Sequence, residues 1–183
     1  MKKTILAMSL IAASLSTAAV ARDGFYVGGA YSMMHYDTIL ASSNEVEDGF
    51  TAYTGYNFAL SDRFVLATEV EYKDLGSTTE KWANISTKAS VTSYGVNLLP
   101  KVYFGDHFHL MAKLGYHNFD IDAVATIQAG QSRTLSDSDT SAVYGLGLGW
   151  DVTQHFTLQT TYEVFSASNN DVASANVGLA YKF

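Results

Sequence analysis

An alternation of apolar and polar residues recurs in eight segments of the chain and restricts its fold more than any other feature. The segments cover residues 24–37, 47–59, 63–74, 87–104, 107–121, 139–152, 155–167 and 171–183. One parity of these segments supplies 41 positions, none of which is charged and only three of which, all threonines, are polar. A period of two residues is typical of β-strands, because successive side chains point to opposite faces. The pattern therefore predicts an all-β chain with one apolar face.

The opposite parity is small, polar or charged. It holds eight glycines and the charged residues Glu69, Glu71, Lys101, Lys113 and Glu163. A soluble barrel would turn the apolar face inward and the polar face to water. Glycine is needed where a narrow barrel crowds its interior side chains, whereas a solvated face has no such need. We therefore expect the polar face to line the inside of the barrel and the apolar face to meet lipid.

Aromatic residues support a membrane barrel. Eight of them share the apolar parity and lie at the same end of the segments, next to the short connections: Phe25, Phe58, Phe64, Phe104, Phe108, Trp150, Phe156 and Phe183. Rings at one level around a barrel form an interfacial girdle, and the short turns place this girdle on the periplasmic side.

The connections alternate in length along the chain. Residues 60–62, 105–106 and 153–154 form short connections, whereas residues 38–46, 75–86, 122–138 and 168–170 form longer or more polar ones. This order predicts an eight-stranded antiparallel up-and-down transmembrane β-barrel with its long loops outside. The first and last strands must pair, because lipid leaves no partner for an open sheet edge.

The beginning of the chain has the form of a secretory signal peptide. Lys2 and Lys3 precede an uncharged stretch over residues 4–18, and Ala19-Val20-Ala21 matches an Ala-x-Ala cleavage site. The apolar stretch is short for the alternative, a membrane anchor. We expect residues 1–21 to be removed and residues 22–183 to form one outer-membrane β-barrel domain.

Three short motifs resemble the OmpA-type family of eight-stranded outer-membrane barrels. They are the opening Gly24-Phe25-Tyr26-Val27-Gly28-Gly29-Ala30-Tyr31-Ser32, the central pair of segments from Leu99 to Phe104 and from Phe108 to Gly115, and the ending Gly178-Leu179-Ala180-Tyr181-Lys182-Phe183. The resemblance implies a location in the outer membrane of a Gram-negative envelope. It also implies that Tyr181 and the terminal Phe183 belong to the signal that the barrel-assembly machinery reads.

The interior charges are the candidate functional residues. Glu69, Lys101 and Lys113 share one face in the middle of the span, and a buried charge needs a partner. We expect Glu69 to pair with Lys101, with Lys113 as a second partner, in a polar plug. Glu71 and Glu163 are expected to lie higher and to meet water.

The resemblance adds a comparison with a known charge switch. In the protein after which the family is named, interior acids and bases form alternative ion pairs that block or open a narrow path. By resemblance Glu69, Lys101 and Lys113 match three members of that set, whereas Gln159 and Gly149 occupy the positions of an arginine and an acid. A gating function is therefore not carried over.

The sequence leaves three functions open. A structural or surface-interaction barrel that acts through its loops is the main reading, and a narrow channel for small solutes is the alternative. A membrane-embedded enzyme fits less well, and we expect no cofactor or metal, because His107-x-His109 supplies only two ligands. Expected partners are outer-membrane lipid and lipopolysaccharide, the barrel-assembly machinery, and a host or phage ligand at the acidic loops. The formal net charge of −7 argues against nucleic acid.

Overall fold

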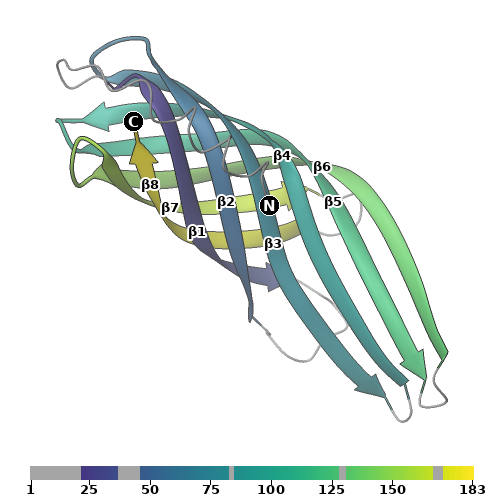
Figure 1. Ribbon diagram of the computed structural model, residues 1–183. Helices are drawn as coiled ribbons and strands as arrows, with labels where there is room; N and C mark the ends of the chain where they lie inside the picture. The colour runs from purple at the N-terminus through teal and green to yellow at the C-terminus, as the bar shows by residue number, and fades with distance from the viewer. Residues whose placement is uncertain (1–21, 37–45, 83–84, 128–130, 167–170) are drawn as a thin grey trace, which may run out of the picture.

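The computed structural model describes residues 22–36, 46–82, 85–127, 131–166 and 171–183, which form one closed barrel. Its strands are β1 (Gly24–Tyr36), β2 (Val46–Ala59), β3 (Phe64–Trp82), β4 (Ile85–Phe104), β5 (Phe108–Ile127), β6 (Gln131–Asp151), β7 (Phe156–Ser166) and β8 (Asp171–Lys182). Every strand pairs antiparallel with its neighbours in the sequence, and β1 pairs with β8 (Figure 1). The predicted fold class, with eight strands in up-and-down order, is confirmed. No helix in the described part of the chain is long and apolar enough to cross a membrane.

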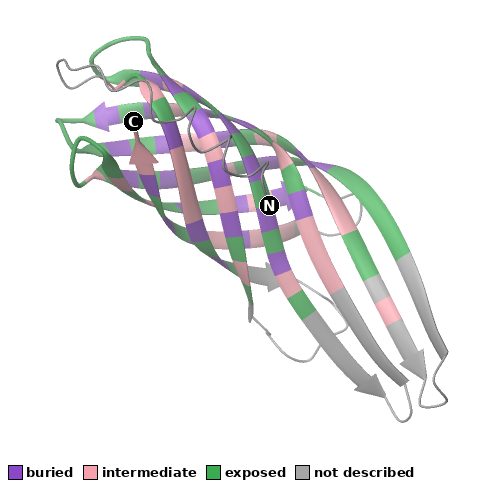
Figure 2. Ribbon diagram, viewed as in Figure 1, coloured by how far each residue is buried: buried purple, intermediate pink, exposed green. Residues whose placement is uncertain are grey.

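Exposure alternates along the strands in the opposite sense to that of a soluble protein (Figure 2). On β3, the outward-facing Val70 is 58% exposed, whereas the inward-facing Glu69 and Glu71 are 5% and 2% exposed. Large apolar side chains therefore cover the outside, and charged side chains fill the inside. Only a lipid environment makes this arrangement favourable, because it removes the apolar surface from water.

Interior glycines lie directly opposite large side chains on the neighbouring strand. Gly28 pairs with Tyr53, and Gly55 pairs with Tyr26. A Cβ atom at Gly28 would meet the Tyr53 ring, and one at Gly55 would meet the Tyr26 ring at 2.6 Å. The same opposition recurs between β4 and β5, where Gly95 faces His117. The glycines on the polar parity therefore provide the volume that the interior side chains occupy, as expected for a narrow barrel.

Short turns and the chain end meet at one end of the barrel. Residues 60–63, 105–107 and 152–155 connect the strands there, and Gly105 has the positive φ of +73° that its turn requires. The backbone N–H of Phe183 donates to the carbonyl of Phe25 at 2.9 Å, which joins the chain end to the first strand. In outer-membrane barrels the end with the short turns faces the periplasm.

At the opposite end, two hairpins extend beyond the rest of the barrel (Figure 1). The β2–β3 ladder ends at Phe50 and Asp74, and the β6–β7 ladder ends at Ala142 and Ser166, while β3 to β6 continue to pair with one another. The expected loops over residues 75–86 and 122–138 are thus mostly strand, which corrects that prediction. Outside the bilayer both faces of a sheet meet water, so the apolar alternation disappears although the backbone pairing continues. We call the four-stranded part formed by residues 75–82, 85–92, 118–127 and 131–141 the projecting sheet.

Candidate functional site

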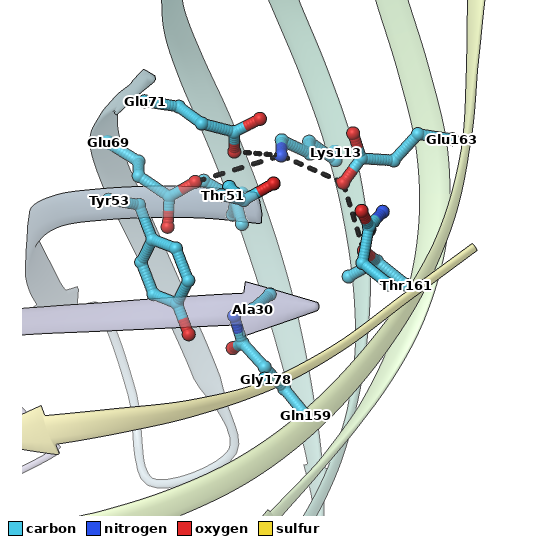
Figure 3. Close-up of a pocket in the computed structure, with 12 residues that line it drawn as sticks. Ala30, Thr51, Tyr53, Glu69, Glu71, Lys113, Gln159, Thr161, Glu163 and Gly178 are labelled. Atoms are coloured by element: carbon cyan, nitrogen blue, oxygen red, sulfur yellow. Dashed lines mark hydrogen bonds and ion pairs between the residues drawn. The ribbon is translucent and has the colours of Figure 1, made fainter. Parts of the chain in front are cut away.

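Five charged side chains from three strands meet in the middle of the barrel. Figure 3 shows four of them, Glu69, Glu71, Lys113 and Glu163. Glu69, Glu71 and Lys73 come from β3, Lys113 from β5 and Glu163 from β7. Lys113 Nζ contacts Glu71 Oε2 and lies 2.9 Å from Glu163 Oε1 and 3.9 Å from Glu69 Oε1. Lys73 Nζ lies 3.1 Å from Glu71 Oε1 and 2.7 Å from Glu163 Oε2. We call these five residues the charge cluster.

Neutral groups complete the hydrogen bonding of the charge cluster. Tyr26 Oη donates to Glu69 Oε2 at 3.0 Å. Asn97 Nδ2 donates to Glu69 at 3.3 Å and to Glu71 at 3.2 Å. Three carboxylates and two ammonium groups give the cluster a formal charge of −1 (2 − 3). Buried ions of this kind persist only when partners satisfy them, because their desolvation is costly.

Lys101 lies apart from the charge cluster, which corrects the expected pair with Glu69. Its ammonium donates to Asn57 Oδ1 at 3.0 Å and lies 5.0 Å from the centre of the Tyr26 ring. It takes part in none of the ion pairs found among the described residues. The structure brings Glu69 to Lys113 instead. The tilt of the strands explains the difference, since it staggers residues that seem level when counted from the short turns.

Glu71 and Glu163 lie elsewhere than the sequence predicted. Glu71 and Glu163 are 2% and 1% exposed, so they lie in the core of the barrel and do not reach the external solvent as predicted. Lys73 is fully buried between them, although the sequence analysis did not name it. Its position two residues after Glu71, on the same parity, was the signal that would have found it.

Apolar layers lie on both sides of the charge cluster. One contains Tyr26, Ala30, Tyr53, Ala67, Leu99, Met111 and Ala180. The other contains Leu75, Val143 and Phe165, packed against Val91, Phe119 and Val172. A cavity beside the charge cluster has a volume of about 20 Å³, which holds about one water molecule. Side chains therefore fill the middle of the described barrel and leave no wide pore there.

Seven of the eight predicted girdle residues are exposed on the outside of the barrel, and Phe183 is half-buried. Phe25, Phe58, Phe104, Phe108 and Trp150 are between 44% and 61% exposed, and the rings of Phe108 and Trp150 stack with centroids 5.9 Å apart. Tyr181 packs against Phe183, with ring centroids 5.0 Å apart. The interfacial role of the girdle and the assembly role of Tyr181 and Phe183 stay predictions.

The projecting sheet carries exposed acidic groups. Asp122, Asp137 and Asp139 are exposed, and Asp120 is half-buried. By sequence, residues 75–92 and 118–141 hold five acidic and three basic residues, a formal charge of −2 (3 − 5). In the part of the chain that the structure describes, no three histidine, aspartate or glutamate side chains gather as a metal site.

A family model for the outer membrane protein beta-barrel domain matches residues 4–183. The chain belongs to this family. It is therefore an integral protein of the outer membrane, as the resemblance to OmpA-type barrels implied.

Known relatives agree with this assignment. The attachment invasion locus protein of Yersinia enterocolitica is 25% identical over 187 residues, which cover the whole of both chains. The crystal structure of Ail, the attachment invasion locus protein of Yersinia pestis, in complex with the heparin analogue sucrose octasulfate, has a TM-score of 0.61 at 20% identity. It covers 88% of this chain and 97% of Ail. Neisserial surface protein A has a TM-score of 0.54 at 16% identity, covering 87% of this chain and 97% of its own. These structural similarities show the fold. None of these relatives is named for an enzymatic activity.

Proposed function

We propose that this outer-membrane barrel is a surface-interaction protein whose projecting sheet binds an extended segment of an external protein. The observation that carries the proposal is the pair of open edges on that sheet. Past Asp74, β3 has no described partner on its β2 side, and before Ala142, β6 has none on its β7 side. Open edges present unpaired backbone donors and acceptors to any strand that approaches.

Two backbone N–H groups on β6 have no strand partner at the open edge and bond to side chains instead. The backbone N–H of Ser138 donates to Asp137 Oδ1 at 3.0 Å, and that of Thr140 donates to Asp139 Oδ1 at 2.8 Å. These amides therefore bond to side chains of their own strand, as expected where no neighbouring strand accepts them. A partner strand with lysine or arginine side chains would engage both carboxylates and leave the amides free to pair with its backbone.

Charge sets the class of partner. The projecting sheet is acidic, so it favours a basic extended segment over a sulfated polyanion. The Ail structure contains a heparin analogue, which is a ligand of the opposite charge class. Attachment, named in the Yersinia enterocolitica relative, supports the general role, while the acidic surface supports a different ligand.

Two proline variants test this function. Successive N–H groups of a strand point to opposite sides, so Ser138→Pro removes an edge donor while Asp139→Pro removes a donor on the β5 side. Bacteria that otherwise do not adhere would express each variant, and cells bound to a cultured animal-cell layer would be counted. Ser138→Pro is expected to lower adherence while the barrel stays folded. Asp139→Pro should destabilise the hairpin itself, as trypsin sensitivity of the hairpin would show.

Competition separates the ligand classes. A lysine-rich peptide is expected to reduce adherence, and heparin is not. Adherence equal to that of cells without the protein, or competition by heparin alone, would refute the proposal.

The proposal includes export, assembly and the contact with lipopolysaccharide. We propose that residues 1–21 are removed after export, that Tyr181 and Phe183 are read by the barrel-assembly machinery, and that divalent cations bridge the acidic loops to lipopolysaccharide. A binding role without catalysis fits the names of the relatives. The water-sized cavity supports this role over the narrow channel.

A further inference from the structure

Exposure is lower toward the charge cluster than near the short turns along the inner face of β7. Thr157 and Gln159, near the short turns, are half-buried, Thr161 is 8% exposed and Glu163 is 1% exposed. All four side chains are polar. They form a polar path from the end with the short turns to the charge cluster.

Two small cavities lie along this path and share Gln159 as a wall. The first, of about 20 Å³, is also lined by Lys101, His109 and Asp151. The second, also of about 20 Å³, lies beside the charge cluster and is also lined by Tyr53. Each volume is that of about one water molecule.

Each cavity has a buried polar side chain that no protein atom satisfies. Both ring nitrogens of His109 lack a hydrogen-bond partner although the residue is only 2% exposed. Tyr53 Oη also lacks one, and Tyr53 is 5% exposed. The Tyr53 ring and the Gln159 side chain lie on the same side of the ion pairs (Figure 3). Buried polar atoms next to a water-sized cavity indicate hydration.

Gln159 lies between the two cavities and lines both of them. It pairs with Gly149 on β6 and with Gly178 on β8. The His109 ring lies over Gly149 and the Ala30 side chain over Gly178, so Gln159 lies next to the ring whose nitrogens lack partners. An amide that lines both cavities can pass a water molecule from one to the other by exchanging hydrogen bonds with it.

The path ends at the charge cluster. Beyond it, Leu75, Val143 and Phe165 are each 2% exposed, and Phe119 packs edge-on against Phe165 with ring centroids 5.2 Å apart. The His117 ring packs against Phe119 and Phe165, but both of its nitrogens already bond, to Ser93 and to Asn97. The layer therefore offers no free polar partner to a water molecule. It therefore separates the charge cluster from the end that carries the projecting sheet.

We propose that the barrel interior is a half-channel that connects the charge cluster with the periplasm and is closed toward the outside. Its ligands are water and small monovalent cations, which the formal charge of −1 on the cluster attracts. Hydration from one side lowers the cost of burying five charged groups in the membrane. The inference is independent of the proposed role of the projecting sheet.

Silver ion, a monovalent cation small enough to follow water, tests the half-channel. The chain has no cysteine, so an introduced cysteine supplies its single thiol, which is the group that the assay reads. In Thr161→Cys, silver replaces the thiol proton to give a sulfur–silver bond and a free proton. The variant would be reconstituted into vesicles, and those with the projecting sheet outward identified by trypsin cleavage of the hairpins.

The side from which silver reacts decides the outcome. Silver added outside is expected to leave the introduced thiol free, and silver admitted to the vesicle interior through a pore-forming peptide is expected to block it. The free thiol is measured with a maleimide dye after unfolding. Reaction from the outside, or no reaction from either side, would overturn the proposal.

Two matched variants sharpen the test. Val143→Cys lies in the apolar layer and is expected to stay unreactive from both sides. Adding Gln159→Leu to Thr161→Cys replaces the amide between the cavities with an apolar side chain, and should slow the reaction from the vesicle interior by about tenfold or more. Fast mobility of unheated barrels on gels shows that each variant is folded. An unchanged rate with Gln159→Leu, or reaction of Val143→Cys from outside, would contradict the path.

Discussion

Replacing Lys113 by methionine tests the architecture of the charge cluster. Lys113 contacts all three carboxylates, whereas Lys73 contacts only Glu71 and Glu163. After Lys113→Met, three carboxylates share one ammonium group, and Glu69 keeps only hydrogen bonds from neutral groups. We expect Lys113→Met to be among the most destabilising single substitutions in the interior.

The distances within the charge cluster set the expected loss in the free energy of unfolding for Lys113→Met. At an effective dielectric constant of about 20, a pair of unit charges about 4 Å apart attracts by about 4 kcal/mol, before desolvation is subtracted. Removing one partner of a buried ion pair costs about 3–5 kcal/mol, because the other charge stays buried. Lys101→Met is the matched control. It loses one hydrogen bond from its ammonium group to the neutral Asn57, at 3.0 Å, and should cost about 2 kcal/mol or less.

Folding titrations in lipid vesicles measure both effects. Tryptophan fluorescence reports unfolding in guanidinium chloride, since Trp150 lies on the outer surface, 44% exposed. The double variant Lys113→Met/Glu71→Gln restores the formal charge of −1 (1 − 2) and should recover about 0.5–3 kcal/mol relative to the sum of the single changes.

Two results would refute this reasoning. One is a loss for Lys101→Met as large as that for Lys113→Met, which would place Lys101 in the network after all. The other is strict additivity in the double variant, which would mean that Lys113 and Glu71 do not stabilise each other.

Three further outcomes are expected. Trypsin added to intact cells should cut the projecting hairpins and spare Arg63 in its short turn. If the hairpins are cut only after the envelope is broken, the assigned orientation is wrong. Phe183→Ser should lower the yield of folded barrel in the outer membrane, as heat-dependent gel mobility would show, and an unchanged yield would argue against its assembly role. Gly55→Ala should destabilise the barrel by about 1–3 kcal/mol, since its Cβ meets the Thr68 carbonyl and the Tyr26 ring. Gly29→Ala, with contacts of 3.4 Å or longer, should cost less.

The alternation of side chains was enough to predict the barrel and its inside and outside. A period of two residues assigns every position of a strand to one face, so residues such as Val70 and Glu69 are separated without further information. Closure followed from the lack of backbone partners in lipid. These are local rules, and each acts on one strand at a time.

The contacts inside the barrel could not be predicted in the same way. They depend on the stagger between strands, which parity does not contain. Counting from the short turns predicted that Lys101 pairs with Glu69 and that Glu163 lies near water. In the structure Lys113 pairs with Glu69, and Glu163 is buried. The projecting sheet was missed for another reason, since its pairing continues where the apolar signal has ended.

The charge cluster also explains how one register is selected among many. A shift of two residues between neighbouring strands keeps every apolar side chain outward, so the lipid-facing surface discriminates poorly against it. The same shift would move Lys113 on β5 or Glu163 on β7 by two residues relative to Glu71 on β3, which is about 6–7 Å along a strand. It would also place interior glycines opposite the wrong partners, so that Tyr26 no longer faced Gly55. Buried ion pairs that break and rings that collide both raise the energy of a slipped barrel. The polar interior therefore specifies the register, while the apolar exterior specifies only that the chain enters the membrane.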